Sequence, residues 1–222
     1  MKKSKVLSVI AALSVVAVLG IGTTMAYFTD TEDAANSAST SRVDISLTDE
    51  GTNTAKIVPG DTIKFNPVVA VAQESADAAV RVKVELKVTK EVATSQTNIA
   101  QCVADLEKMV KGEFGNNNAY AAWLTTDWTI ADVTTDTSAG TVKFVAYYGT
   151  KATPAQFKAN TSSKVFTDTQ TIPTELGNIW ADCKVAAAYT AEAIQYEHMP
   201  ADVWDAVDAG TIAIESYEYV AP

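Results

Sequence analysis

The sequence predicts a mainly β protein, a jelly-roll-like antiparallel β-sandwich with one or two short inserted helices. Three observations predict this fold class. Apolar and polar residues alternate with period two in several separate runs, which is the pattern of strands with one buried face. Turn signals rich in Gly, Pro and Asp divide these runs. Helical periodicity is confined to short segments, so helices cannot supply the main layers.

Alternation defines the first strands of the predicted sandwich. The longest run spans residues 79–90, in which one side carries Val80, Val82, Val84, Leu86 and Val88. The other side carries charged residues and threonine, which predicts one buried and one solvent-exposed face. A shorter run at 42–48 places Val43, Ile45 and Leu47 on one side. The segment 62–71 is also β-rich, but Pro67 cannot donate a ladder hydrogen bond, so we expect an edge strand or a bulge there.

Three further strands are predicted in the second half of the chain. Residues 141–148 alternate again and place Val142, Phe144, Ala146 and Tyr148 on one side. The segments 183–195 and 211–219 complete the list of predicted strands. With the earlier strands they supply enough β-structure for two packed sheets.

Two helices interrupt the strands. Residues 98–111 carry an apolar stripe of helical spacing, made by Ile99, Cys102, Val103, Leu106 and Val110. Asn98 can cap the start of this helix and Gly112 its end. A shorter helix is predicted at 201–208, after Pro200 and before Gly210.

The first 26 residues have the features of a secretory signal peptide. Lys2, Lys3 and Lys5 precede an apolar run at 6–21, and small residues lead to Ala26. We predict cleavage between Ala26 and Tyr27 and secretion of the mature protein; the alternative is an uncleaved membrane anchor. Because cleavage removes three lysines and no acidic residue, the net charge of −10 becomes −13.

The mature chain is predicted to hold one folded domain. Residues 27–40 form an N-terminal segment, and residues 41–222 form a single β-sandwich domain, because a chain of this size with 47% hydrophobic residues can bury one sizeable core. An excess of 27 acidic over 17 basic residues argues against a nucleic-acid partner, since phosphate binding needs clustered Lys and Arg.

The scarcity of histidine and cysteine excludes most metal and cofactor sites. The chain has one histidine, His198, and two cysteines, Cys102 and Cys183, in no metal-binding spacing. We therefore expect no cofactor and no metal. In the oxidising environment outside the cell the two cysteines can form a disulfide, or they can remain two small buried side chains. Spacing does not decide between these alternatives.

Several segments, in order along the chain, carry a resemblance to one family. They are Ala26-Tyr27-Phe28-Thr29-Asp30, Val43-Asp44-Ile45-Ser46-Leu47, Val58-Pro59-Gly60-Asp61-Thr62-Ile63, Ala79-Val80-Arg81-Val82-Lys83-Val84 and Ala191-Glu192-Ala193-Ile194-Gln195. Each is short, but their shared order resembles the TasA and camelysin (CalY) proteins of Gram-positive bacteria, which are exported with the SipW signal peptidase. The matching segments bracket most of the mature chain.

The resemblance implies a secreted protein of the extracellular matrix or cell surface, with a jelly-roll fold, whose subunits assemble into biofilm fibres. It also implies an accessory matrix or anchoring protein as a partner, and strand addition, in which the N-terminal segment of one subunit completes a sheet of the next. The candidate donor strand runs from Tyr27 to about Thr40. Its candidate residues are Tyr27, Phe28, Thr29, Asp30, Ala34, Ala35 and Ala38. From the residues alone, a flexible N-terminal tail is the alternative.

Camelysin-like proteins have been classed as metallopeptidases, so the residues of this chain must be compared with the catalytic motifs of peptidases. A zinc peptidase commonly uses two imidazoles and a carboxylate, as in His-Glu-x-x-His, whereas this chain has the single His198 in a predicted loop. No Gly-x-Ser-x-Gly motif is present either. We therefore predict that the protein is not an enzyme. Calcium binding by oxygen ligands around Asp30, Glu32 and Asp33 stays open.

A secreted carbohydrate-binding module is the second class of function. Aromatic side chains that could line a sugar platform are Trp123, Trp128, Tyr147, Tyr148, Trp180 and Trp204. Aromatic residues at strand positions more often pack in a core or on a sheet face, so the fibre subunit remains the first expectation.

Overall fold

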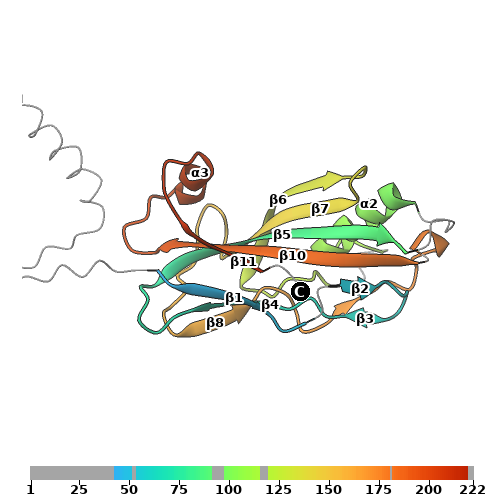
Figure 1. Cartoon of the computed structure of the whole chain (residues 1–222), viewed down its shortest axis with the longest axis horizontal. Helices are drawn as coiled ribbons and strands as arrows, with labels where there is room; N and C mark the ends of the chain where they lie inside the picture. Colours follow the sequence, from blue (N-terminus) through green and yellow to red (C-terminus); the bar gives the residue numbers. More distant parts are fainter. Residues whose placement is uncertain (1–42, 52–53, 92–97, 116–119, 181, 220–222) are drawn as a thin grey trace, which may run out of the picture. The chain divides into compact units, whose positions relative to one another are not determined.

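A computed structural model of the chain describes residues 43–51, 54–91, 98–115, 120–180 and 182–219 (Figure 1). The predicted signal peptide at 1–26 and the N-terminal segment at 27–40 lie outside these residues. Within the described part of the chain, no helix combines the length and the apolar character needed to span a bilayer. The predicted mainly β fold with antiparallel sheets and two short helices is confirmed.

The larger sheet has six antiparallel strands. Five of them follow the order β11-β10-β5-β7-β6, and the sixth, β2, pairs with the beginning of β10, whereas β11 pairs with its second half. Its members are β2 (Thr54–Lys56), β5 (Ala78–Lys90), β6 (Trp128–Asp136), β7 (Thr141–Tyr148), β10 (Cys183–Gln195) and β11 (Glu215–Tyr219). The strands β5 and β10 pair along their whole length, from Lys90 opposite Cys183 to Ala78 opposite Gln195. This long pair lies inside the larger sheet, and the other strands of the sheet lie on either side of it.

Two smaller sheets complete the sandwich. The first has the order β1-β4-β8, with β1 (Ile45–Asp49), β4 (Pro67–Val71) and β8 (Thr161–Lys164). The second pairs β3 (Thr62–Ile63) with β9 (Gln170–Thr171). The prediction that Pro67 marks an edge strand or bulge is wrong, because β4 is the central strand of its sheet. Pro67 is tolerated there as the first residue of the strand, one of the few sheet positions open to proline.

The main core lies between the larger sheet and the smaller sheets, which run along one of its faces in Figure 1. Strand β5 contributes Val80, Val82 and Leu86 to it, and β4 contributes Val69, all fully buried. Phe65, Phe144 and Phe166 fill the centre. The apolar faces predicted from alternation in β5 and β7 are therefore the inner faces of the sandwich.

The helices lie at different places on the larger sheet. Helix α2 (Ile99–Lys111) adds Cys102, Val103, Leu106, Met109 and Val110 to the main core. The Asn98 side chain caps its start by accepting a hydrogen bond from the Gln101 amide, and Gly112 ends it with a φ of 72°. Helix α3 (Val203–Asp208) packs instead on the outer face, where Val203, Trp204 and Val207 form a second cluster with Ala79 and Tyr147.

The structure differs from the predicted elements where alternation is broken. Strand β6 carries a register shift between Ala131 and Thr134, and Asp132 there has a φ of 53°, so the strand has no continuous alternation to predict it. The short strands β2, β8 and β9 were also not predicted, and β11 covers the second half of the predicted 211–219 strand. The outer face of β5 is solvent-exposed only beyond Arg81, because α3 covers its first residues.

Candidate functional site: a buried ion network under helix α3

The outer face of the larger sheet carries a buried arginine. Arg81 on β5 is 1% exposed, and Glu192 on β10 lies directly opposite it in the sheet register. The Arg81 Nε atom donates to Glu192 Oε2 at 2.5 Å. The two Nη atoms donate to the two carboxylate oxygens of Asp208, at 3.1 and 2.6 Å. All three guanidinium nitrogens are thus engaged by carboxylates from β10 and from the end of α3.

An aromatic side chain covers this guanidinium. The Cζ atom of Arg81 lies 4.7 Å from the centroid of the Trp204 ring, within the range of a cation–π contact. Trp204 in turn meets Tyr147 edge to face, with ring centroids 5.9 Å apart. Because Trp204 is on α3 and Tyr147 on β7, the aromatic pair holds the helix over the sheet and excludes water from Arg81.

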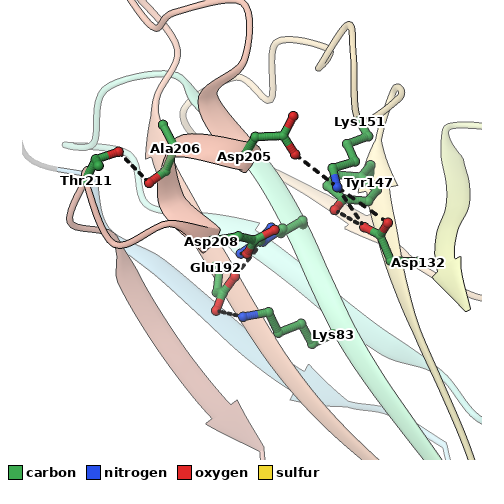
Figure 2. A network of polar contacts seen from close by, with 10 residues as sticks. Lys83, Asp132, Tyr147, Lys151, Glu192, Asp205, Ala206, Asp208 and Thr211 are labelled. Atoms are coloured by element: carbon green, nitrogen blue, oxygen red, sulfur yellow. Dashed lines mark hydrogen bonds and ion pairs between the residues drawn. The ribbon is translucent and has the colours of Figure 1, made fainter. Parts of the chain in front are cut away.

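Lysines extend the network at both sides (Figure 2). Lys83 on β5 binds the second oxygen of Glu192, with Nζ to Oε1 at 2.5 Å. Lys151 bridges Asp132 of the β6 bulge and Asp205 of α3, at 3.2 Å from each. The Tyr147 hydroxyl donates to Asp132 Oδ2 at 2.8 Å. The network therefore joins five elements, β5, β6, β7, β10 and α3, and α3 contributes two carboxylates to it.

The protonation states follow from these contacts. Burial lowers the pKa of Arg81, but the hydrogen bonds to Asp208 and Glu192 outweigh it and raise the pKa above its usual value. The hydrogen bond from Arg81 holds the pKa of Asp208 below its usual value. Burial, together with the hydrogen bond to Asp132, raises the pKa of Tyr147 to about 12, so its hydroxyl remains a proton donor at neutral pH.

This arrangement can hold an element in place. Each of the three Arg81 guanidinium nitrogens already donates to a carboxylate, and the Tyr147 hydroxyl donates to Asp132. Residues 43–51, 54–91, 98–115, 120–180 and 182–219 contain no group of three or more His, Cys, Asp or Glu side chains that could hold a metal ion. The network instead fixes α3 to the sheet, and through the short connection after α3 it places the edge strand β11.

The residues predicted for other sites fall into three groups. The structure brings Cys102 and Cys183 together, with both side chains fully buried and 3.9 Å between the Sγ atoms. His198 is exposed in the connection between β10 and α3, as predicted for a loop histidine. The remaining predicted residues lie outside the described chain: Ala26, Tyr27, Phe28, Thr29, Asp30, Glu32, Asp33, Ala34, Ala35 and Ala38.

The aromatic platform considered for carbohydrate binding is contradicted by burial. Trp123, Trp128, Tyr147, Trp180 and Trp204 are between 0% and 4% exposed, so none presents a ring face to a sugar. Tyr148 is half-buried against Trp128 and Phe157. These aromatics fill the two hydrophobic clusters, which is the common role of such residues in strands.

Sequence reasoning missed the Arg81 network. Arg81 and Glu192 both occupy positions that alternation assigns to the solvent-exposed face of the sheet. Their burial therefore depends on α3, which packs above them. One signal was available: the chain has 15 lysines but two arginines, and one of these lies within its longest alternating run. Arginine is favoured over lysine where a buried guanidinium must bind two carboxylates at once.

Comparison with known proteins gives one match. A family model described as "Camelysin metallo-endopeptidase" matches residues 1–197. This range includes Arg81, Glu192 and both cysteines, whereas α3 follows it. Neither a curated protein nor a solved structure matches the chain.

Proposed function

The chain belongs to the TasA/camelysin family, and from this premise we propose that it is a secreted structural protein whose mature subunits assemble into extracellular matrix fibres by N-terminal strand addition. Removal of residues 1–26 by a SipW-type signal peptidase would release Tyr27 as the new N-terminus. The following segment, to about Thr40, is the donor strand of this proposal. It ends five residues before β1 begins at Ile45.

The observation that carries the proposal is the open three-stranded sheet. Among the described residues, β1 and β8 each pair on one side, with β4 between them. The outer edge of β8 is partly occupied, because the Thr125 hydroxyl donates to the Lys164 carbonyl at 2.8 Å and Trp128 Nε1 donates to the Ser163 hydroxyl at 3.0 Å. Strand β1, which pairs with β4 alone among the described strands, is therefore the edge that an added strand can extend in this proposal.

The surface supports backbone pairing over apolar association. Val58 is the one large hydrophobic side chain that is exposed in the described part of the chain. The described surface therefore offers little exposed apolar area through which subunits could associate. Their charge of −13 also opposes contact at low ionic strength. A donated strand is recognised through backbone hydrogen bonds and needs no apolar patch, whereas acid or salt must reduce the repulsion between subunits.

The test is electron microscopy of the mature protein across pH and ionic strength. We expect fibres to form more readily in acid or in salt, which reduce the repulsion between subunits. Deletion of 27–40 should abolish them. Ala35→Pro is the sharper variant, because it keeps length and charge but removes one backbone donor, and Ala35→Ser is its matched control. Fibres that survive both the deletion and Ala35→Pro would contradict strand addition.

The description of the matched family names a peptidase, so enzyme activity is the second candidate. Zinc-dependent cleavage of an unfolded protein substrate, lost in His198→Ala, would support it and overturn the structural role. We expect no such cleavage. The reason lies in the residues, because one exposed loop histidine leaves a zinc site without the second imidazole that such peptidases use.

A further inference from the structure

We propose that Cys102 and Cys183 become joined by a disulfide as the exported protein folds, and that this bond fixes α2 to the start of β10. The inference rests on the export that belongs to the proposed function, but it does not depend on fibre formation. Two residues 81 positions apart in the sequence meet here, one in the first turn of α2 and the other at the first position of β10.

Geometry places the two sulfur atoms within reach of a bond. The Sγ atoms lie 3.9 Å apart, and both contact the carbonyl oxygen of Ile179, at 3.4 Å from Cys102 and 4.0 Å from Cys183. A disulfide needs about 2.05 Å between the sulfurs, so an approach of about 2 Å joins them. Both backbones are held near the pair: the Cys102 amide bonds to Asn98 and the Cys183 carbonyl accepts from Ile57.

The surroundings favour a disulfide over a metal site. The nearest acidic group on α2 is Asp105, and both of its oxygens are already engaged. Gln101 Nε2 donates to Oδ1 at 2.8 Å and Trp180 Nε1 donates to Oδ2 at 3.0 Å. A metal ion would need further ligands, and the described residues gather no third His, Cys, Asp or Glu beside the two thiols. The pair is thus left with sulfur–sulfur chemistry.

The reaction is thiol–disulfide exchange with a small-molecule disulfide or an extracytoplasmic thiol oxidoreductase as oxidant. One cysteine thiolate attacks a sulfur of the oxidant's disulfide, forms a mixed disulfide and expels one thiolate. The second cysteine then attacks the protein sulfur of the mixed disulfide and expels the other. Two protein thiols lose two protons and two electrons, and the oxidant's disulfide is reduced to two thiols.

Burial determines when this exchange takes place. Both cysteines are 0% exposed, so an oxidant cannot approach them once α2 has docked on the core. Burial also raises the pKa of the Cys102 thiol well above its usual value, which leaves little thiolate to react. The bond must therefore form during folding, before α2 docks. Whether the two cysteines are oxidised or reduced in the folded protein then depends on the redox conditions in which the chain folded.

The first experiment uses the full chain expressed in a Gram-positive host and recovered from the medium. The protein is denatured in iodoacetamide, with and without prior reduction, and weighed by mass spectrometry. Loss of residues 1–26 reports export and cleavage, whereas loss of two hydrogens with no alkylation reports the disulfide. We expect both. Cys102→Ala is the matched control, because its single remaining thiol must take one alkyl group without reduction.

The second experiment separates the disulfide from export. The full-length chain is reduced, unfolded and refolded in reduced or oxidised glutathione. We expect the bond to form when oxidised glutathione is present during refolding, and to form at least about tenfold more slowly when it is added after folding, because the folded thiols are inaccessible. The oxidised protein should unfold at a higher denaturant concentration than the reduced protein.

Each outcome has one meaning. Two alkyl groups without reduction, on secreted protein and again after refolding in oxidised glutathione, overturn the disulfide even if fibres form. Equal rates of oxidation before and after folding overturn its formation during folding. A chain that stays uncleaved inside the cell but forms the bond on refolding contradicts the export premise and supports the disulfide.

Discussion

Helices α2 and α3 are fixed to the same sheet by different physical means. Helix α2 has 13 residues, caps at both ends and a stripe of apolar side chains that enters the main core. Helix α3 has six residues, and Asp202 at its N-cap position makes no side-chain capping bond. It is held on the outer face by the ion pair of Asp208 with Arg81, by the Trp204 ring, and by a small apolar cluster that also contains Val203 and Val207.

The difference shows where the information for each helix resides. A helix as short as α3 is marginal on its own, because nucleation is costly and few backbone hydrogen bonds follow. The position of α3 depends on side chains in β5 and β10. One of them, Arg81, lies 127 residues before its partner Asp208 in the sequence. Helix α2 carries its own start, end and buried face. Removal of the Arg81 charge should therefore affect α3, whereas truncation of an apolar side chain in the main core should affect α2.

The largest effect is expected from Arg81→Ala. Removing the guanidinium leaves the buried Glu192 with the partly exposed Lys83 as its remaining partner, and releases Asp208 from the sheet. Loss of one partner from a buried ion pair costs about 3 to 5 kcal/mol of unfolding free energy. Urea unfolding followed by circular dichroism measures the loss.

Two further variants separate charge from volume at Arg81. Lys83→Ala is the matched control, because Lys83 binds the same Glu192 but its side chain is 46% exposed, so we expect a cost under about 1 kcal/mol. The double variant Arg81→Met with Glu192→Met leaves no buried charge and should recover at least half of the loss. Equal destabilisation by Arg81→Ala and Lys83→Ala would show that the buried network does not secure α3.

Leu106→Ala is the corresponding change in α2. Leu106 is fully buried in the main core, and truncating it removes apolar contacts and leaves a cavity. We expect a loss of about 3 kcal/mol in urea unfolding. Lys108→Ala, on the exposed side of the same helix, is expected to cost less than about 0.5 kcal/mol. Similar losses from the two variants would mean that the apolar stripe is not what holds α2.

Acid should loosen α3 before α2. A carboxyl whose pKa is lowered in the folded protein stabilises the fold above its ordinary value of 3.8, and this contribution is lost as pH falls from there through the folded-state value. Asp208 is such a group, held by Arg81. Because its side chain is 45% exposed, we expect a modest effect, about 1 kcal/mol. Fluorescence of tryptophan between about pH 5 and pH 2 should show a transition that Asp208→Asn removes.

The same contrast explains what could be predicted from the sequence. Strands β5 and β10 were predicted with nearly correct bounds because their periodicity is local, and α2 because Asn98 and Gly112 mark its ends. The burial of Arg81 could not be predicted, since the residue that covers it, Trp204, is distant in sequence. The meeting of Cys102 and Cys183 is equally a result of chain topology. Local signals identify elements, whereas sites made by tertiary contact require the assembled sheet.

The smallest effect compares the two helix starts directly. The Asn98 side chain accepts a hydrogen bond from the Gln101 amide at 3.2 Å, so Asn98→Ala leaves one helix amide without its partner. Such a change costs about 1 kcal/mol. Asp202 occupies the equivalent place in α3 but accepts no such bond, so Asp202→Ala should change the unfolding free energy by less than about 0.5 kcal/mol. Urea midpoints of the two variants, measured side by side, test this. An equal loss at Asp202 would mean that α3 is capped in solution and depends less on Arg81 than its charge pairs indicate.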